Sequence, residues 1–405
     1  MNITLAILAL AFVSASQPEP GKPSVKPKTP VGVPRVLVMK DLSRRSVKFL
    51  AIGPEMVQVV GPRGKTTGVP RRDVLALLPD GPGEGVASGS AGETKLLTAM
   101  GEMLLGSLGS AEEGKEKAET IVWKSRRLGD VAFGLDDLAV IDLVQDSHFA
   151  TPTAPTEDVV RLINGDALRG FVDSIGETVR VEVDKKPRSV PIERVARVEF
   201  GNPPKPLAGA VVWLATGEIL RVTRLTGTPA DSTAVRDGKD VHFPTEEIVG
   251  FVESAGTLLP LAVIAPSSVA PFGTRSVADP MEVGDLAVPL GAADVTLPSP
   301  MVVSWVLPEG AVRVSMRAVL PPACRVWGDC VLILEQEGVK GIGGKTLAKV
   351  RLSGDTPEAD INVELLAGGG ALRATLDPGE NGPIQDRVVL RQPLVLVGAG
   401  AGAVR

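Results

Sequence analysis

The chain has 405 residues, of which 44% are apolar and 22% charged, and its formal net charge is −5. This length exceeds what one hydrophobic core organises, and the apolar content excludes wholesale disorder, so several folded domains are expected. The weakly negative charge supplies no positive field, and we expect no nucleic acid partner. The 45 Gly and 34 Pro follow no collagen-like period, which predicts frequent turns and short elements.

The first segment, residues 1–16, contains an apolar run from Ile3 to Val13. Small residues follow this run, and Val13-Ser14-Ala15 resembles a signal-peptide cleavage site, although no Lys or Arg precedes the run. The alternative is an ordinary buried or interfacial segment. The signal-peptide interpretation predicts export to the periplasm, the cell surface or the extracellular medium.

Residues 17–34 form a stretch rich in Pro and Lys that lacks the apolar side chains needed for packing. We expect an extended linker there, with the mature fold beginning near Arg35. No later segment is predicted to span a membrane, because the apolar stretch 257–271 is interrupted by Pro260 and Pro266.

Internal repetition is the strongest signal in the chain. Four segments share an apolar residue, then Pro or Gly, two variable residues, a mostly charged residue and an aliphatic residue: 69–74, 133–138, 190–195 and 243–248. Pro is excluded from a central ladder position, so a strand should stop at each of these points. A single turn of 3₁₀ helix is then expected before the next strand begins.

A second recurring feature precedes three of these endings. It is a Gly followed by an acid between apolar stretches, at Gly101-Glu102, Gly165-Asp166 and Gly217-Glu218. Gly adopts positive φ without steric cost, which predicts a tight hairpin at each site. Active sites are rarely triplicated, so we interpret the three acids as turn-stabilising residues and not as catalytic ones. The first copy has Met39-Lys40-Asp41 instead and is the most degenerate.

One stretch is ambiguous, because Leu and Met residues within 93–117 fall at the spacing of an amphipathic helix. The repeat register instead places Gly101-Glu102 in a hairpin turn between strands at 95–99 and 103–108. We favour the hairpin, since agreement among copies outweighs local propensity.

Each copy holds a hairpin, further strands, a short turn and a last strand, which is typical of a small β-barrel. Four such repeats are predicted, at 35–79, 94–146, 157–201 and 208–253. The third copy, through its Asn164-Gly165-Asp166 hairpin and its final strand pair, resembles Sm-like and SH3-like barrels. The resemblance implies the barrel fold. It does not extend to RNA binding, because the loops of this chain depart from the RNA-binding loops of Sm-like proteins.

A Pro- and Ser-rich linker is expected at 254–280, and the repeat is absent after it. Alternating strands separated by Gly- or Pro-containing loops then predict an antiparallel β-sandwich at 281–397, followed by a disordered tail at 398–405. The part at 366–396 resembles the novel carbohydrate-binding module, a galactose-binding-like jelly roll found on secreted proteins and glycosidases. The resemblance implies a jelly roll that binds glycan.

The expected fold class is therefore all-β, with four tandem small β-barrel repeats plus a C-terminal antiparallel β-sandwich of jelly-roll type. The two cysteines, Cys324 and Cys330, lie close together in the sequence. In an oxidising compartment they predict one local disulfide, and the alternative is two buried free thiols.

Two kinds of binding residue are proposed in the sandwich. Trp305 and Trp327 have aromatic faces suited to stacking on a sugar ring, with packing in the core or rim as the alternative. Oxygen donors gather near a Gly-rich loop and suit Ca²⁺, with a solvated turn as the alternative; they are Asp377, Glu380, Asn381 and Asp386.

Catalytic motifs are missing from the sequence. The two histidines, His148 and His242, have no Cys or His neighbour at ligand spacing, and no nucleophile elbow, phosphate loop or dinucleotide fingerprint occurs. The leading hypothesis is an exported, non-catalytic protein whose sandwich binds glycan or another cell-envelope component. The alternative is a structural or protein-assembly module that pairs with a cell-envelope protein through its sheet edges. A hydrolase with paired carboxylates ranks third.

Overall fold

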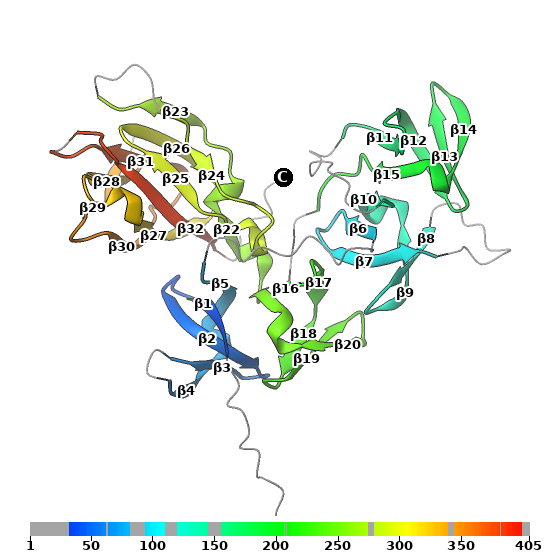
Figure 1. Ribbon diagram of the computed structural model, residues 1–405, viewed down its shortest axis with the longest axis horizontal. Coiled ribbons are helices and arrows are strands. Elements are labelled where there is room, and N and C mark those ends of the chain that lie inside the picture. Colours follow the sequence, from blue (N-terminus) through cyan, green and yellow to red (C-terminus); the bar gives the residue numbers. More distant parts are fainter. Residues whose placement is uncertain are drawn as a thin grey trace, which may run out of the picture. The chain divides into compact units, whose positions relative to one another are not determined.

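The computed structural model describes residues 32–61, 64–81, 94–109, 120–144, 155–205, 207, 209–273, 279–338, 344–380 and 382–398. The predicted signal peptide, most of the predicted linker after it and nearly all of the C-terminal tail lie outside these ranges. Within them, every element is a β-strand or a short 3₁₀ turn (Figure 1), and the predicted all-β fold class is confirmed. No helix among these residues is long and apolar enough to cross a membrane.

The first unit of the repeat is a five-stranded antiparallel sheet with the strand order β5-β1-β2-β3-β4. Its strands are β1 (Val33–Met39), β2 (Arg44–Ile52), β3 (Met56–Val60), β4 (Thr66–Pro70) and β5 (Val74–Pro79). Pro70 ends β4 with a φ of −55°, and the 3₁₀ turn Arg71–Asp73 leads directly into β5. The fixed φ of Pro suits this entry into a turn, as the sequence pattern predicts.

The second and third units repeat this arrangement. The second consists of β6 (Thr94–Thr98), β7 (Met103–Leu108), β8 (Thr120–Ser125), β9 (Gly129–Gly134) and β10 (Leu138–Asp142). The third consists of β11 (Asp158–Leu162), β12 (Ala167–Ile175), β13 (Thr178–Val183), β14 (Lys186–Pro191) and β15 (Val195–Glu199). In the stretch that is ambiguous from sequence, β6 and β7 form a hairpin and Gly101 has a φ of 79°. The hairpin prediction is therefore confirmed, and the helical alternative is wrong.

The fourth unit differs in that its second strand is broken at Thr223. Its strands are β16 (Ala210–Leu214), β17 (Ile219–Val222), β18 (Arg224–Gly227), β19 (Asp231–Arg236), β20 (Lys239–Pro244) and β21 (Ile248–Val252). In all four units the first and last strands pair, but the last two strands are joined only by the 3₁₀ turn. The units are thus curled, open sheets and not closed barrels.

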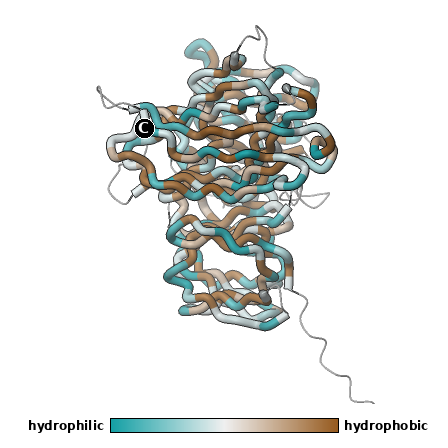
Figure 2. Tube along the Cα trace, turned by 90° about the vertical axis from the view of Figure 1, so that its left-hand side faces the viewer, coloured by the Kyte–Doolittle hydropathy of each residue, from teal (hydrophilic) through white to brown (hydrophobic). Residues whose placement is uncertain are grey.

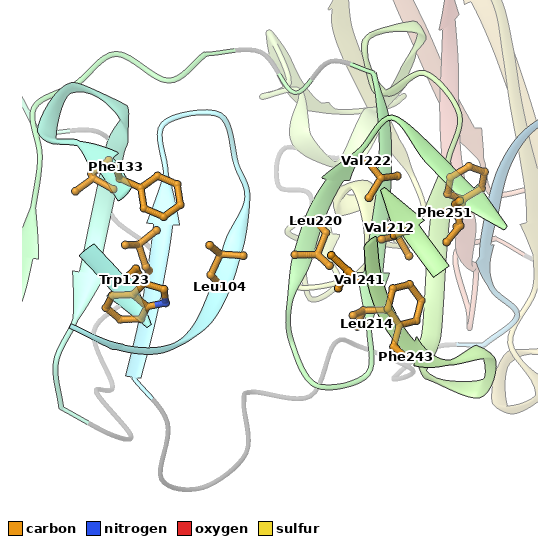
Figure 3. Packing of buried hydrophobic residues seen from close by; sticks show 14 of the residues in the cluster. Leu104, Trp123, Phe133, Val212, Leu214, Leu220, Val222, Val241, Phe243 and Phe251 are labelled. Carbon is orange, nitrogen blue, oxygen red and sulfur yellow. The ribbon is translucent and has the colours of Figure 1, made fainter. Parts of the chain in front are cut away.

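Alternation of apolar and polar residues along the strands builds the core of each unit (Figure 2), because successive side chains point to opposite faces. Figure 3 shows apolar side chains gathered inside the second unit, namely Leu104, Trp123 and Phe133, and inside the fourth, namely Val212, Leu214, Leu220, Val222, Val241 and Phe243. All of them are buried. Trp123 packs in this core, and Trp213 packs in a separate buried cluster with Leu258 and Leu394, so both side chains are buried.

The last strands of the units also join the units in pairs. Strand β5 pairs with β21, where Leu77 faces Phe251, and β10 pairs with β15, where Ile141 faces Val198. The first unit is therefore joined to the fourth, and the second to the third. Each pairing covers a sheet edge that would otherwise be exposed.

The C-terminal domain is a sandwich of two antiparallel sheets, as predicted. One sheet contains β22 (Leu258–Pro260), β24 (Glu282–Val283), β25 (Val295–Pro298), β27 (Ala311–Val319), β30 (Glu358–Glu364) and β32 (Arg387–Val397). The other contains β23 (Ser268–Pro271), β26 (Met301–Leu307), β28 (Asp329–Gln336), β29 (Lys345–Ser353) and β31 (Gly370–Asp377). Strands β22 and β23 lie in the stretch expected as a linker. Their Pro residues are compatible with edge strands, where a missing N–H is tolerated.

Candidate functional site

The two tryptophans proposed as ligand contacts have opposite environments. Trp305 lies on β26, is 1% exposed and is part of the sandwich core, so it offers no face to a sugar. Trp327 lies in the loop between β27 and β28 and is 60% exposed. Val326 beside it is also exposed. Only Trp327 therefore remains a candidate for ligand contact.

The loop that carries Trp327 is closed by local hydrogen bonds. After Pro321 the chain makes the 3₁₀ turn Pro322–Cys324, and the N–H of Gly328 donates to the carbonyl of Cys324 at 2.9 Å. A Cβ at Gly328 would lie 2.4 Å from that same carbonyl oxygen, so only Gly allows this closure. The closure places Val326 and Trp327 at the tip, pointing away from the core.

Three further loops meet at this end of the sandwich, which we call the loop end. The N–H of Leu320 donates to the carbonyl of Pro357 at 2.7 Å, joining the Trp327 loop to the β29–β30 loop. The N–H of Asp329 donates to Oδ1 of Asp386 at 2.9 Å, joining it to the β31–β32 loop. The N–H of Ser299 donates to the carbonyl of Asp386 at 2.7 Å. The Trp327 loop and the predicted calcium loop are therefore neighbours, which the sequence does not reveal.

Asp386 is the buried anchor of the loop end and is 3% exposed. Its Oδ1 accepts the Asp329 N–H, while its Oδ2 has no hydrogen-bond partner among the described residues. Burial, reinforced by the charge of Asp329, raises the pKa of Asp386 to about 7. Asp386 therefore titrates in the neutral range while holding two loops together.

Asp329 has the opposite electrostatic environment. Nε and one terminal nitrogen of Arg351 donate to its two carboxylate oxygens, both at 2.8 Å. These charge-assisted bonds hold the pKa of Asp329 below its usual value. The Arg351 guanidinium is half exposed and also lies 3.9 Å from Oε1 of Glu380. Arg351 thus links the buried acid to the surface.

The acids proposed for calcium have separate partners, and that of Asp386 is the Asp329 N–H. Asp377 accepts the N–H of Gly379 at 3.3 Å, and Glu380 faces Arg351. Asn381 lies outside the described residues. Among the residues that are described, no group of three or more His, Cys, Asp or Glu side chains is placed to hold a metal. A calcium site formed by Asp377, Glu380, Asn381 and Asp386 stays a prediction.

The predicted disulfide is absent from the structure. Cys324 is a half-buried free thiol in the 3₁₀ turn, and Cys330 is a buried free thiol on β28. Burial, with smaller effects from the neighbouring acids, raises the pKa of Cys330 to about 12. The short spacing that suggested a disulfide reflects instead a tight loop closed by backbone hydrogen bonds and core packing.

The chemistry available at the loop end is that of a binding surface. An exposed indole face suits the apolar face of a sugar ring, and the neighbouring Arg351 and Glu380 supply hydrogen bonds for hydroxyl groups. Asp329 and Asp386 differ in pKa as the two acids of a glycosidase would. Both are almost fully buried, however, so a glycosidic oxygen does not reach them.

Some residues of the loop end carry no signal in the sequence. Arg351 is one of several charges on the outward face of β29, and nothing local distinguishes it from Lys345 or Lys349. Ile384, which is exposed in the β31–β32 loop, looks like any turn residue. Their grouping depends on loop closures between segments about 40–90 residues apart, which local patterns do not encode.

No protein-family profile matches the chain, and no curated protein matches it. Solved structures similar to it include carbohydrate-binding modules. One shows CBM51-2 in complex with GlcNAc and INT domains from Clostridium perfringens ZmpB, at 10% identity and a TM-score of 0.29, covering 44% of this chain and 38% of that one.

Another is CBM51 from Clostridium perfringens GH95 in complex with methyl-galactose, at 9% identity and a TM-score of 0.26, covering 34% of this chain and 99% of that one. The tandem CBM51 modules of Sp3GH98 from Streptococcus pneumoniae SP3-BS71 match at 8% identity and a TM-score of 0.27, covering 90% of this chain and 88% of theirs. Likeness at this level says nothing about the ligand of this chain.

Proposed function

We propose that this chain is an exported, non-catalytic protein that binds glycan through the loop end of its sandwich. The observation that carries the proposal is the 60% exposure of Trp327 at the tip of a closed loop. Trp327 and the adjacent Val326 leave apolar surface exposed to water, and covering this surface with a ligand would be favourable.

Rigid placement of the indole supports binding over simple surface exposure. The Gly328 closure and the Asp386 anchor fix the two ends of the loop, which lowers the entropy lost when a ligand binds. Arg351 and Glu380, which lie at the same end of the sandwich, are polar groups suited to the hydroxyl groups of a sugar stacked on the indole. A ring with an apolar face and several hydroxyl groups is therefore the ligand class that we propose.

The absence of catalysis at this site is proposed on physical grounds. The two acids with divergent pKa values are buried below the surface, and the exposed Glu380 faces a guanidinium. A general acid must reach the leaving oxygen within hydrogen-bond distance. Incubation of the full chain with each polymer that it binds should release no reducing ends.

The binding test uses the full chain on a panel of cell-envelope and plant polysaccharides, followed by calorimetry on the best ligand. We expect binding, and we expect Trp327→Ala to weaken it by about tenfold or more, since aromatic stacking adds about 1 kcal/mol beyond area burial. The matched control is Phe171→Ala, which removes an exposed aromatic from the third unit and should leave affinity unchanged. Equal binding by Trp327→Ala and the parent chain would exclude this site.

Export is proposed from the leader sequence and is tested separately. The chain expressed in a bacterial host should be found outside the cytoplasm with a new N-terminus near Gln17. A full-length, cytoplasmic product that retains residues 1–16 would contradict export. Glycan binding by the purified chain does not depend on that outcome.

A further inference from the structure

The second and fourth units contact each other through a reciprocal exchange of charges. Glu102 of the second unit accepts two hydrogen bonds from Arg236 of the fourth, at 3.0 and 3.1 Å. Glu218 of the fourth unit accepts a hydrogen bond from Arg127 of the second. Glu102 is buried and Glu218 is 0% exposed, so the exchange lies inside the contact.

The exchange uses the same two positions in each unit. Each acid follows the Gly of the first hairpin, and each arginine lies at the turn between the strands equivalent to β3 and β4 of the first unit. Beside the acids, Met103 on β7 pairs with Ile219 on β17. Each unit therefore contributes one acid and one arginine to the contact, which is the pattern of a two-fold, self-complementary interface.

The equivalent hairpin of the first unit is also covered. Arg44, at the start of β2, donates to the carbonyl of Ser315 at 3.1 Å, and Asn362 Nδ2 donates to the carbonyl of Asp41 at 2.8 Å. Ser315 and Asn362 both belong to the sandwich. Thus three of the four hairpins contact another domain of the same chain.

The third unit has the same charges on an exposed hairpin. Ile163 is 61% exposed, and the hydrogen bonds of Asp166 among the described residues, to Asn164 and Leu162, lie within its own hairpin. The turn between β13 and β14 carries Lys185 and Lys186, both exposed. We call Ile163, Asp166, Lys185 and Lys186 the third-unit face. It carries an acid at the hairpin and bases at the second turn, as the second and fourth units do.

We propose that the third-unit face binds the third-unit face of a second copy of this chain, in the reciprocal arrangement of the second and fourth units. Asp166 of each copy then pairs with Lys185 and Lys186 of the other. The face is complementary to itself under a two-fold rotation, which singles out an identical chain as its partner. Exposed Lys–Asp pairs are weak and screened by salt, so a dimer that dissociates with rising salt is expected.

Sedimentation velocity of the full chain tests the proposal at low ionic strength. We expect dimers at about 100 µM, as for a small polar interface. Asp166→Lys and the double variant Lys185→Glu with Lys186→Glu should each be monomeric, because like charges then face each other. Mixing the two variants should restore a 1:1 dimer, since each variant complements the other at both contacts.

The control is Glu193→Lys, which changes an exposed charge in the 3₁₀ turn of the same unit. It should dimerise like the parent chain. A parent chain that stays monomeric at about 100 µM overturns the proposal. So does an Asp166→Lys chain that still dimerises, or a mixture of the two charge variants that stays monomeric. Circular dichroism of each variant confirms that these surface changes leave the fold intact.

Discussion

Buried carboxylates have different structural roles in the repeat units and in the sandwich. Between the second and fourth units, Glu102 and Glu218 are buried against arginines of the opposite unit, which joins two domains. At the loop end of the sandwich, the buried carboxylate of Asp386 accepts the backbone N–H of Asp329, which holds the C-terminal side of the Trp327 loop. The comparison teaches that Glu102 and Glu218 are buried where two units meet, whereas Asp386 is buried where two loops of one domain are joined.

The largest difference in stability is expected between variants of the two tryptophans of the sandwich. Trp305→Ala should lower the free energy of unfolding by about 3–5 kcal/mol, because it leaves a cavity in the core. Trp327→Ala should change it by less than about 0.5 kcal/mol, because the side chain is exposed. Urea unfolding monitored by circular dichroism measures both. A large loss of stability for Trp327→Ala would mean that its loop packs against something and does not present a ligand face.

A second difference in stability is expected between variants of two turn acids of the repeat, Glu218 and Asp166. Glu218→Gln should lower the free energy of unfolding by about 2 kcal/mol, because the buried Arg127 guanidinium then keeps only Glu247 as its charge partner. Asp166→Asn alters the same position in the third unit and should cost less than about 0.5 kcal/mol at high salt, because Asp166 is exposed. Thermal unfolding at matched salt measures the difference. Equal effects at the two positions would contradict the assigned contact.

The pH dependence of the free energy of unfolding tests the role of Asp386 in the sandwich. Its pKa of about 7 in the folded state lies above the ordinary value of 3.8, so the folded chain binds this proton more tightly than the unfolded chain. That stability is fully present below about pH 4 and is lost as pH rises through 7, by an amount on the order of 2 kcal/mol. Asp386→Asn cannot ionise and should flatten this part of the pH profile. A parallel profile for the parent chain and the variant would contradict the assignment.

The smallest expected effect concerns the thiols. Because Cys324 and Cys330 are free, a reducing agent should leave the melting temperature unchanged, and the intact mass under non-reducing conditions should correspond to two thiols. The buried Cys330, whose pKa is raised to about 12, should resist alkylation in the folded chain at pH 8. A mass lower by two hydrogens would show a disulfide.

Local signals in the sequence predict most of the fold. The Gly101-Glu102 turn and the Pro70, Pro191 and Pro244 strand ends give the repeat, because each depends on the φ preference of one residue. The sequence does not show that the barrels are open. Pro and the 3₁₀ turn keep the last two strands of each unit from pairing, and this separation cannot be read from composition. The two buried turn acids were also missed, because their partners lie 91 and 134 positions away.

The candidate site was predicted in pieces. Residue type identifies Trp327 and the acids around Asp386. It does not distinguish Trp327 from Trp305, which is buried, and only the apolar strand around Trp305 indicates that position. Asp329 and Arg351 were missed because their pairing joins two strands across a long loop. Residue type alone therefore suggested the chemistry, and tertiary packing selected which residues present it.

Fluorescence of the four tryptophans tests glycan binding at Trp327 most directly. Trp123, Trp213 and Trp305 are buried, so acrylamide should quench mainly Trp327 in the folded chain. A saturating glycan ligand should protect that accessible fraction, and the Trp327→Phe variant should show almost no accessible fraction to protect. Unchanged quenching in the presence of every polymer that the chain retains would show that glycan binds elsewhere and would contradict the proposed site.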